Sequence, residues 1–298
     1  MPLNAAGTIE IPGSADSMFD HGALEPTTRR VFVAHTSRNC VQVIDQKAGR
    51  HLATLDGFPE AAGVVAEDGD VLVTNRGAAS LAWITARTLE TRAVLKTGAR
   101  PNGVALVARS RLAVVACIGD ETHGPELQAL HLDGGYRRAI ELPGRPRWCV
   151  VDRDGGRIFL AIRDPSMVLV ARLPELDDVR HWGLPCAGAH GLDIDHAGGV
   201  LYAACDGGML IRVDARSGAI LGRWPLAGVP DATFFNPTSG LVHVAIAEPG
   251  LTQTIDPRTD ANTRCPTAPG VKTTALVPPD RLLVFSPFHR GILELREA

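Results

Sequence analysis

Seven polar residues stand at matching places in a repeat that runs the length of the chain. They are His21, Glu60, Asn102, Arg147, His190, Asp231 and Lys272. Two carboxylates, two imidazoles, two cations and an amide are groups that move protons, bind metal ions and hold anions. Small or apolar residues such as Ala23 and Leu192 follow just after them. The pattern is therefore typical of a ligand pocket with a polar rim and an apolar throat.

The two histidines define two alternative chemistries. Neighbouring repeats are expected to place His21 beside Glu60, and the same offset places His190 beside Asp231. In one hypothesis these four residues bind a divalent metal ion, which polarises a carbonyl or activates water. In the other no metal binds, and a histidine acts as general base or acid beside its carboxylate. The sequence leaves both open.

Two cations complete the predicted site. Arg147 and Lys272 are expected to hold an anionic group of the substrate, or to stabilise negative charge that develops during the reaction. Asn102 and Trp148 are predicted to line the same pocket. A simpler interpretation also stays open, in which a wet channel mouth keeps these polar residues solvated or paired with one another.

An insertion in the third repeat, Cys117 to Pro125, is expected on the same face. It would bring Asp120, Glu121 and His123 beside the channel mouth, where long loops often supply specificity. His123 is therefore a further predicted substrate contact, although a tolerated surface insertion explains the loop equally well. Residues of lower priority on this face are His35, Asn75, Arg163, Asp206, Glu248 and His289.

The element that must position these residues is a short apolar strand that recurs seven times. Its copies begin at Arg30, Asp70, Arg111, Arg157, Val200, Leu241 and Arg281, which are 40 to 46 residues apart. A hairpin turn rich in Gly, Asp, Asn or Pro joins each copy to an inner strand before it, and two further strands follow each copy. Such a period with four strands per unit predicts one all-β domain over residues 1–298, a seven-bladed β-propeller.

The last repeat needs a strand from the other end of the chain. It ends at the segment Gly291 to Arg296, which leaves no residues for its outer strand and would expose a sheet edge. The N-terminal segment Ile9-Glu-Ile-Pro-Gly13 matches an outer strand elsewhere, Ile140-Glu-Leu-Pro-Gly144. We therefore expect the N-terminal strand to complete the last blade.

The repeat resembles the YVTN-type β-propeller family, whose unit contains P-x-G-[VI]-A, then R-[LV]-Y-V-[AT]-N, then V-x-V-[IV]-D. The matching segments are Pro101-Asn-Gly-Val-Ala105, Arg30-Val-Phe-Val-Ala-His35 and Val41-Gln-Val-Ile-Asp45. The resemblance implies that the starts of the innermost strands converge on a central channel. It also favours a metal there, because streptogramin lyases and sugar-lactone hydrolases are propellers with metal sites in the funnel. The Trp-Phe-Thr-Glu motif of the lyases is absent.

Composition excludes some partners and leaves others open. The formal net charge is −3, and no cluster of Lys and Arg is interleaved with aromatic residues, so nucleic acid is not expected as a partner. No apolar run reaches the length of about 18 residues that a membrane span requires. The six cysteines lack a C-x-x-C pair, which favours reduced thiols. The sequence as written predicts a cytoplasmic monomer, with export after removal of a signal peptide as the alternative.

These observations favour a metal-assisted hydrolase or lyase, similar to lactonases, that acts on a small anionic or lactone-like substrate in the central funnel. The alternative is a non-catalytic propeller scaffold that binds a protein or small ligand on the same face.

Overall fold

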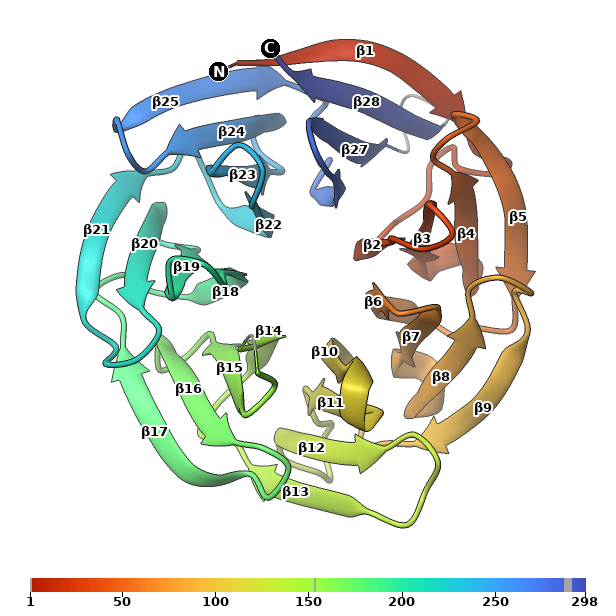
Figure 1. Ribbon diagram of the computed structural model, residues 1–298, viewed down its shortest axis with the longest axis vertical. Coiled ribbons are helices and arrows are strands. Elements are labelled where there is room, and N and C mark those ends of the chain that lie inside the picture. The colour runs from red at the N-terminus through yellow and green to blue at the C-terminus, as the bar shows by residue number, and fades with distance from the viewer. Residues whose placement is uncertain (1, 153, 287–290) are drawn as a thin grey trace.

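The computed structural model describes residues 2–152, 154–286 and 291–298, and these form a ring of seven four-stranded antiparallel sheets (Figure 1). In each sheet the strands follow one another outward from the axis in chain order, except for the last, which contains both ends of the chain. The predicted seven-bladed β-propeller is confirmed.

The blades are numbered here in chain order. The first blade contains β2 (Gly22–Glu25), β3 (Arg30–His35), β4 (Cys40–Asp45) and β5 (Arg50–Asp56). The second contains β6 (Ala61–Glu67), β7 (Asp70–Asn75), β8 (Ser80–Thr85) and β9 (Thr91–Lys96). The third contains β10 (Pro101–Val107), β11 (Leu112–Cys117), β12 (Glu126–His131) and β13 (Arg137–Glu141). The fourth and fifth contain β14 (Pro146–Val151), β15 (Arg157–Ile162), β16 (Met167–Arg172) and β17 (Asp177–Gly183); and β18 (Ala189–Asp195), β19 (Val200–Cys205), β20 (Met209–Asp214) and β21 (Ile220–Pro225). The last two contain β22 (Pro230–Asn236), β23 (Leu241–Ile246), β24 (Leu251–Asp256) and β25 (Ala261–Pro266); and β26 (Thr273–Val277), β27 (Arg281–Ser286), β28 (Gly291–Glu297) and β1 (Leu3–Glu10).

The core lies between the blades. The second strand of each blade is an almost unbroken apolar run, and its side chains are buried on both faces of the sheet, as in β15 and β19. Phe159 of the fourth blade packs with Leu192 and Leu201 of the fifth, which illustrates the contact that recurs around the ring. Burial on both faces explains why these strands lack alternating polar residues.

Helices are few and short in the described ranges. Three 3₁₀ turns are found, η1 (Thr36–Arg38), η2 (Arg76–Ala78) and η3 (Ala108–Ser110). None of the described helices has the length and apolar character that would be needed to cross a bilayer. All six cysteines are free thiols.

The N-terminal strand closes the ring as expected. β1 pairs antiparallel with β28 in the last blade, with Ile9 opposite Ile292 (Figure 1). The strand begins earlier than the sequence match indicates and ends at Glu10, with a bulge between Ala5 and Gly7. Ile9 is buried against the first and last blades, so closure adds apolar contacts as well as hydrogen bonds.

Replacing Ile9 by Ala tests this closure. We expect the free energy of unfolding to fall by about 2–4 kcal/mol, because the substitution leaves a cavity at the seam of the ring. Thr8→Ala is the matched control, since Thr8 belongs to the same strand and its side chain is exposed. Denaturant unfolding measures both, and equal losses in the two variants would argue against a role of this strand in holding the ring together.

Candidate functional site

A bulge at the start of the innermost strand sets the geometry of the channel mouth. The pairing of the innermost strand with its neighbour shifts at the same place in five blades, at Ala61/Val64, Pro101/Val104, Pro146/Cys149, Ala189/Gly191 and Pro230/Thr233. A bulge releases residues from the ladder and re-aims their side chains. Proline before the bulge suits this place, because it has no N–H to donate.

The register then defines one inner-ring position per blade. The fourth residue of the second strand is paired with a residue of the innermost strand, and the inner-ring position lies two residues before that partner. The residues at this position are Asp20, Ala62, Asn102, Arg147, His190, Asp231 and Lys272. Five of them are the residues that the sequence places there.

His21 and Glu60 lie off the inner ring, and their predicted pairing is wrong. The Pro59-Glu60 dipeptide imitates the Pro-x pattern of other blades, but the strand register aligns Ala62 instead. Glu60 is exposed and has a left-handed backbone with φ of 49°, as Arg100 does with φ of 51° in the next blade. The Glu60 carbonyl accepts a hydrogen bond from the N–H of Arg76, and its side chain is absent from the described lining of the cavity.

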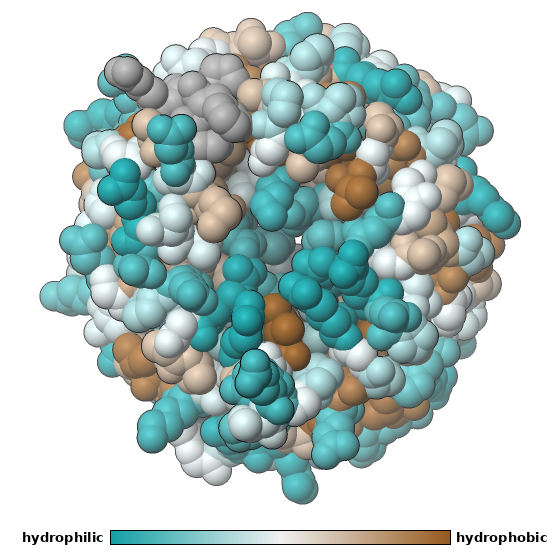
Figure 2. All heavy atoms as spheres, turned by 180° about the vertical axis from the view of Figure 1, so that it is seen from behind, coloured by the Kyte–Doolittle hydropathy of each residue, from teal (hydrophilic) through white to brown (hydrophobic). Residues whose placement is uncertain are grey.

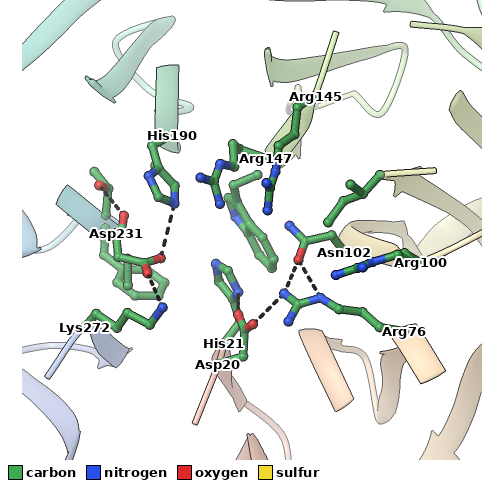
Figure 3. Close-up of a pocket in the computed structure, with 16 residues that line it drawn as sticks. Asp20, His21, Arg76, Arg100, Asn102, Arg145, Arg147, His190, Asp231 and Lys272 are labelled. Atoms are coloured by element: carbon green, nitrogen blue, oxygen red, sulfur yellow. Dashed lines mark hydrogen bonds and ion pairs between the residues drawn. The ribbon is translucent and has the colours of Figure 1, made fainter. Parts of the chain in front are cut away.

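Asp20 takes the place beside His21 that was predicted for Glu60. His21 Nδ1 lies 2.6 Å from Asp20 Oδ1, and Arg76 Nη2 donates to Asp20 Oδ2 at 2.6 Å (Figure 3). Arg76 also donates through Nε to Asn102 Oδ1 at 3.1 Å, so one guanidinium connects three blades. Although burial opposes the charge, His21 and Arg76 hold the pKa of Asp20 well below its usual value.

His21 itself forms part of the cavity wall. Its ring stacks on Trp148, with centroids 3.8 Å apart and planes 6° from parallel. His21 and Trp148 occupy the position after the inner ring, where three other blades have Gly63, Gly103 and Gly191. The glycines pack against the backbone of the next blade, whereas His21 and Trp148 stack on each other. Trp148 also lines an apolar cavity deeper in the channel, so it separates a polar from an apolar compartment.

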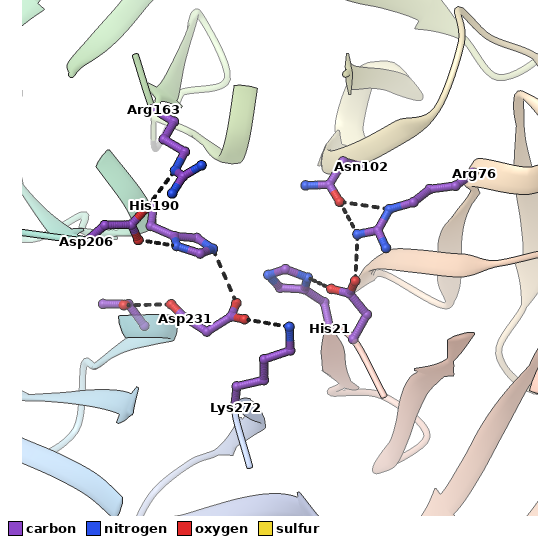
Figure 4. A network of polar contacts seen from close by, with 10 residues as sticks. His21, Arg76, Asn102, Arg163, His190, Asp206, Asp231 and Lys272 are labelled. Atoms are coloured by element: carbon purple, nitrogen blue, oxygen red, sulfur yellow. Dashed lines mark hydrogen bonds and ion pairs between the residues drawn. The ribbon is translucent and has the colours of Figure 1, made fainter. Parts of the chain in front are cut away.

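A second imidazole is fixed on the opposite side. His190 Nδ1 lies 2.7 Å from Asp206 Oδ1, and Asp206 Oδ2 accepts a hydrogen bond from Arg163 Nε at 2.7 Å (Figure 4). His190 Nε2 lies 3.7 Å from Asp231 Oδ1, and Lys272 Nζ lies 3.5 Å from Asp231 Oδ2. The predicted neighbours His190 and Asp231 are thus close, but the hydrogen bond of His190 goes to Asp206.

The ionisation of this group follows from its surroundings. Burial lowers the pKa of His190, and the nearby Arg147 lowers it further against the opposing charges of Asp231 and Asp206. Burial raises the pKa of Asp206, but the hydrogen bonds from His190 and Arg163 outweigh it and keep that pKa low. Because an ionised carboxylate only accepts, neutral His190 carries its proton on Nδ1 and presents a lone pair at Nε2.

These groups surround one cavity of about 170 Å³ at the centre of the ring. Figure 3 shows the side chains of His190, Arg147 and His21 pointing into it from different blades. Arg76, Arg100 and Arg145 line it as well, and none of these three is predicted from the sequence. A hollow bordered by hydrophilic side chains is visible at the centre of one face (Figure 2).

The inserted loop contributes little to the cavity. Ile118 lines it, but the side chains of Asp120, Glu121 and His123 are exposed, and Asp120 Oδ1 lies 3.1 Å from His123 Nδ1. His123, predicted to bind substrate, therefore lies outside the described lining.

The lower-priority residues are distributed more widely. Arg163 and Asp206 belong to the His190 network. His35 is buried and bonded to Ser17 and Gln42, and Asn75 is buried. Glu248 is exposed. His289 lies outside the described residues.

The predicted metal ligands do not converge as a coordination set. Within the described ranges, no three His, Cys, Asp or Glu side chains are grouped closely enough to hold a metal ion. Glu60 is exposed and lies outside the described lining of the cavity, so it does not join the other three predicted ligands. The residues present do not fit a divalent metal at His21, Glu60, His190 and Asp231, and no chemical step is derived through one.

Comparison with solved structures shows the same fold in proteins of different kinds. A structure of streptogramin B lyase matches with a TM-score of 0.83 and 13% identity, over 99% of this chain and 97% of that one. Hydrazine synthase of Kuenenia stuttgartiensis matches at 0.82 and 14%, over 97% and 99%. A chain of the mitotic checkpoint complex matches at 0.80 and 10%, over 99% and 92%. At such identities the likeness shows the fold alone.

Sequence comparisons give no assignment. No family model matches the chain, the YVTN-type repeat included, and no curated protein matches it.

Close packing between neighbouring innermost strands is testable at Gly191. A Cβ there would lie 2.4 Å from the carbonyl oxygen of Asp231 and 2.2 Å from Thr233 Oγ1. We expect Gly191→Ala to lower the free energy of unfolding by about 1–3 kcal/mol, because backbone must move. Gly183→Ala is the control, since a Cβ at Gly183 meets no atom within 4 Å. Thermal unfolding compares them, and equal stability of the two variants would contradict the packing argument.

Proposed function

We propose that this chain is a lyase-type enzyme that removes a proton from a small anionic substrate in the central cavity. The observation that carries this proposal is the orientation of His190. Its Nδ1 is held by Asp206, and its Nε2, 3.7 Å from Asp231 Oδ1, belongs to the lining of a cavity that also contains five cations. A base held in one tautomer beside a group that binds the substrate is the arrangement that general base catalysis requires.

Three groups share the work in this mechanism. An arginine binds the anionic group of the substrate, so that a neighbouring C–H bond lies against His190 Nε2. His190 takes the proton, the electron pair of that bond forms a carbon–carbon double bond, and the leaving group departs with its own bonding pair. His21, when protonated, carries an N–H at Nε2 that can be given to the leaving group, while Asp20 stabilises its charge.

The lining of the cavity favours proton transfer over covalent catalysis. Among the described residues that line it, neither serine nor cysteine is found, and Thr233 is the one hydroxyl. Thr233 Oγ1 donates to the carbonyl of Asp231, 3.2 Å away, so it is not paired with a base. The likeness to streptogramin B lyase shows that this fold can carry a lyase, and it assigns no reaction to this chain. Its substrate is not carried over.

His190→Asn tests the proposed base. The assay is a panel of small hydroxy acids and phosphorylated hydroxy acids in D₂O, followed by proton NMR for loss of a C–H signal and for new alkene signals. For a probe that reacts, we expect His190→Asn to lower the rate by about 10²–10⁴-fold. Asp206→Asn should lower it by a similar factor with little change in KM, because the tautomer is lost and the cations remain.

His181→Asn is the matched control, because His181 is an exposed histidine of the outer strand β17. It should react at the wild-type rate. Lactones in the same panel, followed by acid release, detect hydrolase activity. If the wild-type protein reacts with every probe no faster than His190→Asn does, the proposal is overturned and the non-catalytic scaffold is favoured.

The pH dependence gives a separate test. The proposed base works only when it is neutral, so activity must fall as the pH drops through the pKa of His190. Since burial lowers that pKa below its usual value of 6.5, we expect the acidic limb of the kcat/KM profile to have its midpoint below pH 6.5. A midpoint above that value would contradict the assigned role. The profile of Asp206→Asn, which removes a carboxylate near His190, should be shifted to still lower pH.

A further inference from the structure

The described lining of the cavity carries more positive than negative charge. Five cationic side chains line it, Arg76, Arg100, Arg145, Arg147 and Lys272, against two carboxylates, Asp20 and Asp231. With neutral imidazoles this is an excess of three positive charges. The chain as a whole has a formal charge of −3, so the excess is local and runs against the charge of the protein.

The excess is concentrated on three arginines. Arg76 and Lys272 each lie beside a carboxylate, Asp20 and Asp231 respectively. Arg100, Arg145 and Arg147 form no ion pair with any residue that the structure describes. The Nε of Arg147 is buried and has no hydrogen-bond partner among those residues. An unsatisfied, buried guanidinium nitrogen is costly, which is an argument that a ligand supplies the missing acceptor.

Arg145 lies between the other two in electrostatic terms, because the charge of Arg100 acts on Arg145 and the charge of Arg145 acts on Arg147. Burial lowers the pKa of Arg145, and the charges of Arg163, Arg100 and Arg76 lower it further against the opposing charge of Asp206. Burial also lowers the pKa of Arg147, and Arg145 contributes in the same direction against the opposing charges of Asp206 and Asp231. Figure 3 shows Arg145 and Arg147 side by side at one end of the cavity, with Arg100 nearby. Like charges held together in this way are stabilised by an anion between them.

The contacts around the inner ring show where this anion belongs. Asp20, Arg76 and Asn102 connect the first blade to the third. Arg163, Asp206, His190, Asp231 and Lys272 connect the fourth to the seventh. Among the described residues, this series of side-chain hydrogen bonds and ion pairs is interrupted between the third and fourth blades and between the seventh and first. At the interruption between the third and fourth blades, the cavity-lining charged residues are all cations, namely Arg100, Arg145 and Arg147.

We infer that the substrate of this site is a dianionic oxyanion, such as a phosphate monoester or a dicarboxylate, bound by Arg100, Arg145 and Arg147 between the third and fourth blades. That the dianion is a substrate rests on the proposed function, but its binding does not depend on catalysis. A neutral lactone would neutralise none of the three guanidinium charges, a monocarboxylate one and a dianion two. Arg100 and Arg145 are exposed and are otherwise balanced by solvent, whereas Arg147 is partly buried. The planar forks of arginine match the oxygen geometry of phosphate and carboxylate groups.

Anion binding is measured by calorimetric titration at constant ionic strength. The probes are methyl phosphate, sulfate, malonate and acetate. We expect the three dianions to bind with a Kd at least about tenfold lower than that of acetate. Methyl phosphate should bind more tightly as the pH rises through its second pKa of about 6, whereas sulfate, which stays dianionic, should not. The comparison of methyl phosphate with malonate shows which dianion the site prefers.

Substitutions locate the binding site. Arg145→Gln and Arg147→Gln should each raise the Kd for the preferred dianion by about tenfold or more, and Arg147→Lys should have a smaller effect, because it keeps the charge and loses the fork. Arg180→Gln is the matched control, since Arg180 is an exposed arginine of β17. It should bind as the wild type does.

His190→Asn separates this inference from the proposed function. It should bind the dianion within about threefold of the wild type, because charge complementarity and not the base holds the ligand. Dianion binding without any reaction would support the site and count against the lyase. Acetate binding as tight as that of the dianions, or unchanged dianion binding in Arg147→Gln, would overturn the inference whatever the activity of the chain.

Discussion

The close approach of neighbouring innermost strands is the constraint on which the whole site depends. At Gly63, Gly103 and Gly191 a Cβ would lie 2.1 to 2.4 Å from the carbonyl oxygen of an inner-ring residue, namely Asn102, Arg147 and Asp231 respectively. In these three blades the glycine therefore lets the innermost strand pack directly against the backbone of the next blade's inner-ring residue. Where His21 and Trp148 replace glycine, their side chains are turned into the channel and stack there. One position thus serves both to pack the blades and to close the cavity.

The fold repeats, but the charges placed on it do not. The cations Arg76, Arg100, Arg145 and Arg147 come from the second to fourth blades, and the carboxylates Asp206 and Asp231 come from the fifth and sixth. The channel mouth therefore has a more positive side, where Asp20 is paired with Arg76, and a more acidic side, where Lys272 lies beside Asp231. A cleft with walls of low dielectric focuses such a field and raises the local concentration of anions, even on a protein whose formal net charge is −3.

The repeat was predictable from the sequence, because apolar runs and turn residues recur with a period that any blade must satisfy. Inner-ring residues were predictable where a proline precedes the bulge, as at Asn102, Arg147 and Asp231. His190 and Lys272 were predicted correctly without that proline. Asp20 was missed by one residue, and Ala62 was missed because the Pro59-Glu60 pair imitates the pattern two residues earlier. Arg76 was missed because its importance comes from reaching two other blades, which no spacing along one strand encodes.

The partner of His190 shows why pairs across blades are harder to predict than pairs within one. Asp206 follows the second strand of the same blade, and its backbone N–H is bonded to the carbonyl of Gly188 at 2.8 Å, so the path between the two side chains is short and stiff. Asp231 must reach His190 from the next blade and remains 3.7 Å away, while Lys272 competes for it. The nearer carboxylate therefore orients the ring, and the farther one stays 3.7 Å from Nε2. In the proposed mechanism, Asp231 would balance the proton that His190 Nε2 receives. The different positions of the two aspartates follow from the connectivity of the blades.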